Sequence, residues 1–395
     1  MPLDLKKLIP LYIGAAIGPM GGFGIVTILP VLAQSWSVAF STAAVAITFY
    51  MVPFIIIQIF SGAIAQLFDV RKTLLFGFSL YTVGAVLSGT ATGLGTFLTY
   101  RIVQGVGAGF LTPIIMALIG ELVAERHMGK AIGMLGVAYT IGVTLGPFLS
   151  GMIEVRLGWP WFFYFLALLA FTAGASYALT SQRVVRPAGT SSGLLDVVAL
   201  LKRALREPGV IGISFAAFTL FLAYVGVMTF TADYLKSGFG LPSDKVGVML
   251  SITGFSGIFA SPMAGFLGDR LGRRRVFLMG TAVAVCAVAL MLLAGYSYSG
   301  FLLFFLLLGT GAATAWTSLN TMAVQLSIEL RQPVTSVYNA IKFSGYALSP
   351  AVLSLIYAPF GLKSVQAACI IAIVMASVLA ATARNRPAKT ETGLY

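Results

Sequence analysis

The sequence predicts an all-α integral membrane protein with twelve transmembrane helices in two pseudo-symmetric six-helix bundles. Three observations lead to this fold class. Of the 395 residues, 58% are hydrophobic and only 9% are charged, whereas a soluble domain carries roughly a quarter charged residues. The mean hydropathy is +0.96. A charged motif that starts at Gly265 has a degenerate copy that starts at Gly62, about half the chain earlier, as expected of a duplicated unit.

The apolar residues form long runs that are separated by short polar breaks. Because a helix needs ~20 mostly apolar residues to cross a bilayer, each run predicts one membrane-spanning helix. The runs are too long for the strands of a membrane barrel, which alternate over ~10 residues. In chain order, the predicted spans are residues 8–33, 41–66, 73–93, 96–119, 131–153, 161–180, 209–233, 245–268, 276–295, 300–326, 334–358 and 363–383.

Basic residues are distributed unevenly among the predicted connections. If the N-terminus lies in the cytoplasm, the cytoplasmic loops and tails hold 19 of the 25 Lys and Arg residues, and the opposite side holds four. This bias predicts a multi-pass protein of the cell membrane with both termini in the cytoplasm. The net charge of +13 therefore reflects topology, and we expect no nucleic-acid partner. The first apolar run is about twice as long as a signal-peptide core, so we expect a retained helix.

The longest hydrophilic stretch, residues 181–208, predicts a cytoplasmic linker. It separates an N-terminal bundle at residues 1–180 from a C-terminal bundle at residues 209–395. The first part of the linker is rich in Pro, Gly and Ser, which favour flexible loops. The second part, residues 194–205, is amphipathic and basic. That pattern fits a helix on the cytoplasmic membrane face and fits a solvated linker equally well.

Three motifs occur in the expected spans and in a fixed order. "GFLGDRLGRRR" occupies residues 265–275, and its worn counterpart "GAIAQLFDVRK" occupies residues 62–72. "RIVQGVGAG" begins at Arg101 in the fourth span, and "GVTLGPFLSG" occupies residues 142–151 in the fifth. With these motifs the chain resembles transporters of the major facilitator superfamily. The motif in the fifth span is similar to that of the twelve-helix drug:proton antiporter branch.

The resemblance implies that the 265–275 turn is a conformational latch between the two halves. It implies that Asp269 faces the start of the fifth span, near Gly129 and Lys130, when the transporter faces outward. A carboxylate is favourable at a helix N-terminus. The alternative is that the turn only anchors topology. In the first-half copy Gln66 replaces the aspartate and Asp69 replaces a glycine. We therefore expect an asymmetric latch that depends mainly on Asp269 of the second half. The predicted latch residues are Gly265, Asp269, Arg270, Gly272, Arg273 and Arg274.

Two basic residues fall inside predicted spans, where an unpaired charge is costly. Arg101 needs acceptors, which Gln104 and the glycine-rich part of the first span can supply. It either pins the first and fourth spans or serves as a gate or proton-route element. Lys342 lies about eight residues into its span, too deep to reach the membrane surface. No Asp or Glu lies in the middle of any span, and Asp233, at the end of the seventh, is among the nearest.

The eleventh span places side chains suited to a substrate around Lys342. Tyr338 and Tyr346 lie one turn before and after it on the same helix face. Aromatic rings favour an ammonium group through cation–π contact, although ordinary core packing also explains aromatic residues here. The other predicted members of a substrate cavity are Asn339, Trp316 and Asn320.

Small residues leave part of the fifth span without bulky side chains, which allows another helix to pack closely. These positions are Gly142, Gly146 and Gly151, and Pro147 adds a bend point because it lacks a backbone donor. The resemblance suggests that this motif contacts the eighth span, residues 245–268, across the two halves. Packing alone does not reveal the direction of transport.

These observations predict a secondary active transporter that exports small amphiphilic or drug-like molecules in exchange for protons. The alternatives are proton-coupled uptake or export of a specific anionic metabolite, and flipping of a lipid-linked substrate. We expect no catalytic site, metal site or cofactor, because the chain has one histidine and lacks a phosphate-binding loop. A membrane enzyme and a channel fit the composition and the duplicated architecture less well. The expected partners are a small-molecule substrate, protons and the lipid bilayer, and we expect a monomer.

Overall fold

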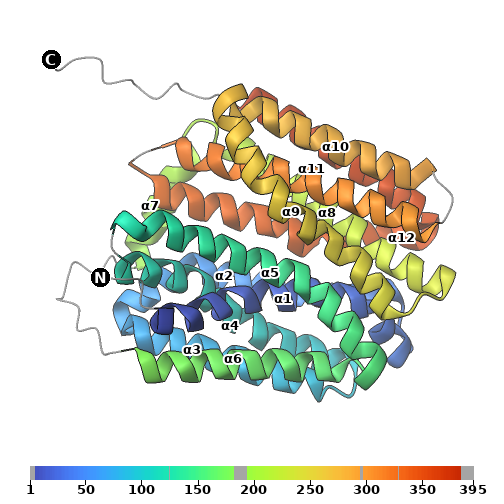
Figure 1. Cartoon of the computed structure of the whole chain (residues 1–395), viewed down its shortest axis with the longest axis horizontal. Helices are drawn as coiled ribbons and strands as arrows, with labels where there is room; N and C mark the ends of the chain where they lie inside the picture. The colour runs from blue at the N-terminus through green and yellow to red at the C-terminus, as the bar shows by residue number, and fades with distance from the viewer. Residues whose placement is uncertain (1–4, 124, 182–193, 294–296, 328, 384–395) are drawn as a thin grey trace.

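The computed structural model describes residues 5–123, 125–181, 194–293, 297–327 and 329–383. In these ranges the chain is helical with short connections, and no strand occurs (Figure 1). The elements are α1 (Leu5–Ser35), α2 (Phe40–Phe68), α3 (Val70–Gly89), α4 (Leu94–Leu122), α5 (Glu125–Leu157), α6 (Pro160–Thr180), α7 (Leu194–Arg206), α8 (Val210–Asp233), the π-helical turn η1 (Tyr234–Gly238), α9 (Ser243–Leu271), α10 (Arg273–Leu293), α11 (Tyr298–Gln325) and α12 (Arg331–Thr382).

The last two predicted spans form the two limbs of α12. This helix is 52 residues long, and its backbone leaves the helical region at Gly361, where φ is 73° and ψ is −172°. Leu353 and Cys369, from opposite sides of Gly361, both lie beside Gly226 of α8. The chain therefore reverses at Gly361, a positive-φ position that glycine adopts without steric cost. Within the described ranges, eleven helices are long and apolar enough to cross a membrane, and the two limbs of α12 give twelve crossing segments.

The helices form two groups with α7 between them in the sequence. Helices α1–α6 lie in the lower part of Figure 1 and helices α8–α12 in the upper part. The duplicated turn supports the repeat at the level of the backbone. Asp69 has φ 85° and ψ 122°, and Gly272, its counterpart in the second half, has φ 89° and ψ 136°. Two turns with the same unusual conformation thus follow the second helix of each group.

Helix α7 packs on the protein, an arrangement that neither interpretation of the linker anticipated. Its Ala204 is fully buried in a small apolar cluster with Leu330, Val334 and Val337 of the chain around the start of α12. Its basic residues Lys202 and Arg203 are exposed. An amphipathic helix gains stability by burying its apolar stripe, and here the surface of the second half accepts it. The Pro/Gly/Ser-rich part of the predicted linker, residues 182–193, lies outside the described residues.

The two halves meet at the end of the molecule away from α7. There Phe40 of α2 contacts the rings of Phe230 and Tyr357, with centroids 5.8 and 6.0 Å apart. Glu154 of α5 and Lys236 of η1 form an ion pair with a nitrogen–oxygen distance of 3.9 Å. We call this end the closed end. It also holds Arg156, Lys245 and Lys363 at helix ends, whereas the α7 end holds most of the other basic residues of the described chain.

The inter-half contacts continue to mid-depth. The hydroxyl of Thr48 donates to the carbonyl of Ala347 at 2.6 Å, and the rings of Phe54 and Phe343 lie 5.5 Å apart. Towards the α7 end, a Cβ added at Gly136 or Gly265 would meet no atom within 4 Å. The described contacts between the halves therefore concentrate between mid-depth and the closed end.

Candidate functional site

An aromatic cluster joins the two halves near the middle of their helices. Phe23 of α1 lies 5.0 Å from the ring of Tyr346 and 6.3 Å from that of Tyr224. Trp316 of α11 packs on Tyr224 and on Phe221 at 5.5 and 5.6 Å. The sequence identified Trp316 and Tyr346 but missed the other three. Within apolar spans no signal separates an aromatic residue of a site from one of the core.

Lys342 lies in this cluster with its side chain buried. The residue is 7% exposed, and its Nζ donates to Oδ1 of Asn339 at 2.7 Å. The ammonium also lies over three rings, at 4.5 Å from Phe343, 5.1 Å from Tyr338 and 5.5 Å from Phe221. Cation–π attraction of this kind is worth about 0.5–2 kcal/mol. The expected contact of Lys342 with Tyr338 is present in the structure.

A hydrogen bond ties the remaining predicted residues of the eleventh span to the tenth. The Tyr338 hydroxyl donates to Oδ1 of Asn320 at 2.7 Å, and Tyr338 is 2% exposed whereas Asn320 is exposed. The structure therefore brings together Tyr338, Asn339, Lys342 and Asn320. Trp316 joins this group indirectly, because its ring packs on Phe221, which in turn contacts Lys342. Tyr346 instead points to the first half.

Arg101 of α4 is fully buried in the first half. Its guanidinium donates to Oε1 of Gln104 at 2.6 Å and, at the limit of hydrogen-bond length, to the carbonyl of Gly21 at 3.5 Å. It also lies 4.1 Å from the centre of the Tyr50 ring. Both acceptors expected from the sequence, Gln104 and the glycine-rich part of α1, are present. Arg101 thus ties α4 to α1 and α2.

Tyr346 extends from the helix that carries Lys342 towards the half that contains Arg101. It follows Lys342 by one helical turn, and its hydroxyl lies near Gly22 of the other half, close to the Tyr50 ring that contacts Arg101. A Cβ built at Gly22 would lie 3.5 Å from the Tyr346 hydroxyl oxygen and 3.6 Å from the Tyr50 ring, so both side chains reach α1 at this position. That oxygen is buried and has no hydrogen-bond partner among the described residues. A buried polar group with spare hydrogen-bonding capacity therefore lies at the contact between the halves.

Asp233 lies apart from these cations, at the closed end. It is 7% exposed, and its carboxylate accepts hydrogen bonds from Ser237 at 3.0 Å and Tyr357 at 2.7 Å. The Tyr357 ring packs 4.7 Å from Phe230 and 6.0 Å from Phe40 of the first half. A buried carboxylate thus lies directly behind the aromatic contact that joins the halves.

The glycines of the fifth span serve two different interfaces. A Cβ at Gly151 would meet the backbone of Ser243 of α9, which agrees with the expected contact between the halves. The same expectation is wrong for Gly142 and Gly146, whose missing side chains would meet the α1 backbone at Ala16 and Met20. Glycines at i and i+4 share one helix face, whereas Gly151 is five residues beyond Gly146 and faces elsewhere. The Pro147 carbonyl lies against Gly247 of α9.

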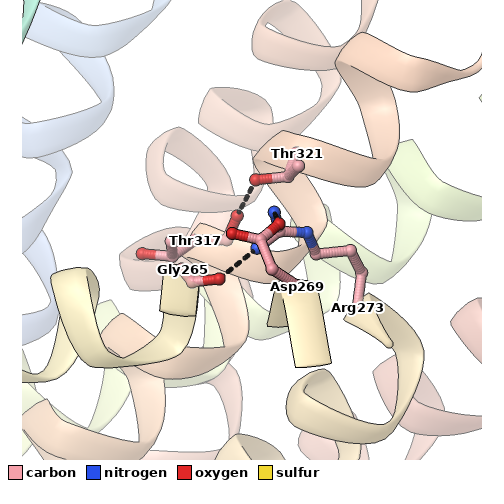
Figure 2. A network of polar contacts seen from close by, with 5 residues as sticks. All are labelled: Gly265, Asp269, Arg273, Thr317 and Thr321. Atoms are coloured by element: carbon pink, nitrogen blue, oxygen red, sulfur yellow. Dashed lines mark hydrogen bonds and ion pairs between the residues drawn. The ribbon is translucent and has the colours of Figure 1, made fainter. Parts of the chain in front are cut away.

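In the 265–275 turn, Asp269 and Arg273 face each other beside Thr317 and Thr321 of α11 (Figure 2). Asp269 pairs with Arg273, whose guanidinium also donates to the Gly265 carbonyl at 2.7 Å. The Arg270 guanidinium lies 4.1 Å above the Phe266 ring. Among the described side chains the partner of Asp269 is thus a residue of its own half, and no described contact joins it to Lys130 at the start of α5. The other two predicted latch residues, Gly272 and Arg274, are exposed.

Within the described part of the chain, no group of three or more His, Cys, Asp or Glu side chains could hold a metal ion. Two other carboxylates, Glu121 and Glu329, lie near the ends of predicted spans. The side chain of Glu121, at the end of α4, lies outside the described residues, and Glu329 is exposed in the turn before α12.

Comparison with known proteins gives a consistent result. The family model of the Major Facilitator Superfamily matches residues 11–326 and again residues 213–394. An uncharacterized MFS-type transporter of Bacillus subtilis, YwfA, is 26% identical over 92% of this chain and 88% of its own. Multidrug resistance protein Stp of Mycobacterium tuberculosis is 24% identical over 84% of this chain and 71% of its own.

A solved structure shares the fold. It is a bacterial homolog of the human lysosomal transporter Spinster, described as inward-facing and unoccupied. The two chains superpose with a TM-score of 0.76 over 96% of each, at 15% sequence identity.

Proposed function

The chain belongs to the Major Facilitator Superfamily, and from this membership we propose that it exports small amphiphilic molecules across the cell membrane in exchange for protons. The observation that carries this proposal is the aromatic cluster between the halves, which contains Lys342 and, through Tyr346, reaches α1 close to the Tyr50 ring that contacts Arg101. Transporter sites are built from side chains of both halves near mid-membrane, where a rocking motion can expose them to either side.

The proposed cycle is alternating access, with this structure as the state open towards the α7 end. The closed-end contacts of Phe40, Tyr357, Glu154 and Lys236 support this assignment. We take the α7 end as cytoplasmic, because the loops there carry most of the Lys and Arg. The described shape is similar to that of the inward-facing Spinster homolog, which agrees with an inward-open state.

Two buried groups are candidates for the proton exchange. Asp233 accepts hydrogen bonds from Ser237 and Tyr357 while the closed end is shut, and separation of Phe40 from Tyr357 would bring water to its carboxylate. Lys342 is the other candidate, because a desolvated ammonium can lose its proton where a carboxylate performs this task in related exporters.

The rings favour an amphiphilic cargo. Phe221, Trp316 and Phe343 offer apolar surface for a flat or aliphatic body, and the relative Stp, which is named a multidrug resistance protein, is compatible with a broad range of such molecules. A transporter for one specific anionic metabolite is the second candidate. The two buried cations, Arg101 and Lys342, favour it.

Transport into inside-out membrane vesicles tests the proposal. N-phenyl-1-naphthylamine, a neutral fluorescent amphiphile, serves as the probe, with an acidic vesicle interior that mimics the outside of a cell. We expect accumulation that requires the gradient and stops when nigericin collapses it. Vesicles without the protein are the control. Accumulation that ignores the gradient contradicts proton coupling, and gradient-driven loss of probe from preloaded vesicles contradicts export.

A further inference from the structure

We propose that the central cluster binds the anionic head group of its cargo, so that the favoured substrates are aryl-alkyl carboxylates. In this arrangement the carboxylate pairs with Lys342, and the apolar body lies against Phe221, Trp316 and Phe343. The inference rests on the proposed function and deepens it by naming the chemical class of the substrate.

The hydrogen-bonding capacity of Lys342 is largely unused. A lysine ammonium has three donors, and among the described residues Nζ has one acceptor, the amide oxygen of Asn339. Its other close neighbours are the rings of Phe343, Tyr338 and Phe221, which attract a cation more weakly than a carboxylate does. A buried ammonium without a counter-ion is costly, and an anionic ligand would offset that cost.

The chain provides no internal counter-ion at this depth. On the described membrane-spanning helices, every Asp and Glu stands in the first or last turn, as Glu154, Asp233, Asp244 and Asp269 illustrate. The centre therefore holds the charges of Arg101 and Lys342 without a carboxylate from the protein. Such a site repels an amine, gives a neutral ligand only apolar contact, and attracts an anion.

A second donor lies on the same helix face as Lys342. The Tyr346 hydroxyl is buried and unpartnered among the described residues, and positions i and i+4 share a face of a helix. The Tyr346 ring also packs on Phe23 of the first half. A carboxylate held by Lys342 and Tyr346 would thus lie next to the interface that moves during transport.

Equilibrium binding to the purified full-length protein in detergent tests the inference. The probes are 4-phenylbutyrate, 4-phenyl-1-butanol and 4-phenylbutylamine, which share one body and differ in head group, measured by calorimetry at neutral pH. We expect the carboxylate to bind at least about tenfold more tightly than the alcohol, with the amine weakest. Equal affinities, or preference for the amine, would overturn the proposal.

Variants of Lys342 test whether this residue causes the preference for the carboxylate probe. Lys342→Met should bring the affinity for phenylbutyrate down to that for the alcohol, whereas Lys342→Arg should retain the preference because it keeps the charge. Lys363→Met is the matched control, since Lys363 is an exposed lysine of the same helix at the closed end. If Lys342→Met keeps the preference, the assignment is wrong. Should that variant not fold, Tyr346→Phe and the wild-type probe series decide, because both test the same head-group recognition.

A failure of this inference can be distinguished from a failure of the proposed function by measuring binding and transport separately. The same preparations can be reconstituted and tested for gradient-driven movement of N-phenyl-1-naphthylamine. Intact transport without a preference for the carboxylate overturns the anionic inference alone. A clear preference without gradient-driven transport sustains the inference and contradicts proton-coupled export.

Discussion

At the residue scale, Asp69 carries backbone strain that its repeat counterpart avoids. Its φ of 85° is one that Gly272 adopts freely, and its carboxylate partly compensates by accepting a hydrogen bond from the Lys72 backbone at 3.0 Å. Unfavourable φ/ψ costs about 1–3 kcal/mol, and loss of a capping side chain costs about 1 kcal/mol. We expect Asp69→Ala to lower the unfolding temperature and Asp69→Gly to leave it unchanged or raise it, as measured by thermal unfolding in detergent. Equal losses in both variants would contradict the strain.

Substitution of Arg101 decides between the two roles left open by the sequence. Arg101→Met removes the bonds to Gln104 and Gly21 and the contact with Tyr50. We expect a loss of stability of about 2–4 kcal/mol, together with loss of gradient-driven transport if Arg101 also acts in the gate. Thermal unfolding and vesicle transport are measured in parallel, with Arg156→Met, at the exposed end of α5, as control. Lower stability with wild-type transport per folded molecule would make Arg101 a structural pin only.

Charged and polar residues of the site were more predictable than apolar ones. An arginine or lysine within an apolar span is conspicuous because it must find partners, and helical spacing then pointed to Gln104 and Tyr338. Phe23, Phe221 and Phe343 had no such signal, since their role depends on which helices meet. The pairing of Asp233 with Tyr357 joins residues 124 positions apart, and only the folded chain reveals it.

At the scale of elements, the helices were largely predictable from hydropathy. The predicted spans agree with the observed helices to within a few residues, because bilayer thickness sets the length of each apolar run. The hydropathy pattern could not predict which neighbouring helix packs against each face of a helix. Thus α7 is amphipathic, as expected, but its apolar face packs near Leu330 and Val334, and the glycines of α5 divide between α1 and α9.

The division of the α5 glycines gives a prediction at the same scale. Gly151→Leu places a side chain against the Ser243 backbone, and such overpacking costs about 1–3 kcal/mol. We expect the closed end to separate, lowering the yield of bismaleimide cross-linking between cysteines introduced by Glu154→Cys and Lys236→Cys. A change of this size shifts a two-state population about fivefold or more. The background carries Cys286→Ser, because Cys286 is exposed.

Gly136→Leu is the control for this experiment. Gly136 lies on the same helix, and a Cβ there would meet no atom within 4 Å, so the cross-linking yield should match that of the parent. An undiminished yield in Gly151→Leu would show that α5 and α9 tolerate a bulky side chain and that their close packing does not hold the closed end together.

At the scale of the whole molecule, the structure is asymmetric along its length. Polar and aromatic contacts join the halves at the closed end, whereas the described polar contacts of the duplicated turns at the α7 end lie within their own halves. Arg71 donates to Ser181 and to the Ala178 carbonyl at the end of α6, and Arg273 donates to Gly265. The cost of leaving Asp269 exposed is small in this state, because an exposed ion pair contributes about 0–1 kcal/mol.

This asymmetry makes the latch hypothesis testable through Asp269→Asn. If Asp269 reaches the start of α5 only when the α7 end closes, the variant loses about 0.3–1 kcal/mol in that state and little in the present one. The population open at the α7 end should therefore rise. Impermeant maleimide labelling should increase at Asn320→Cys, an exposed position on α11, and decrease at Phe40→Cys, within the closed-end contacts.

Glu329→Gln is the matched control for the latch, because it neutralises another exposed carboxylate at the α7 end without touching the turn. Its labelling at both positions should equal that of the parent, so that a response of Asp269→Asn cannot be ascribed to the loss of surface charge alone. Thermal unfolding should be nearly unchanged in both variants, since Asp269 is exposed and its ion pair among the described residues is with Arg273 of the same turn. If Asp269→Asn leaves the labelling unchanged at both ends, the turn anchors topology and does not couple the two halves.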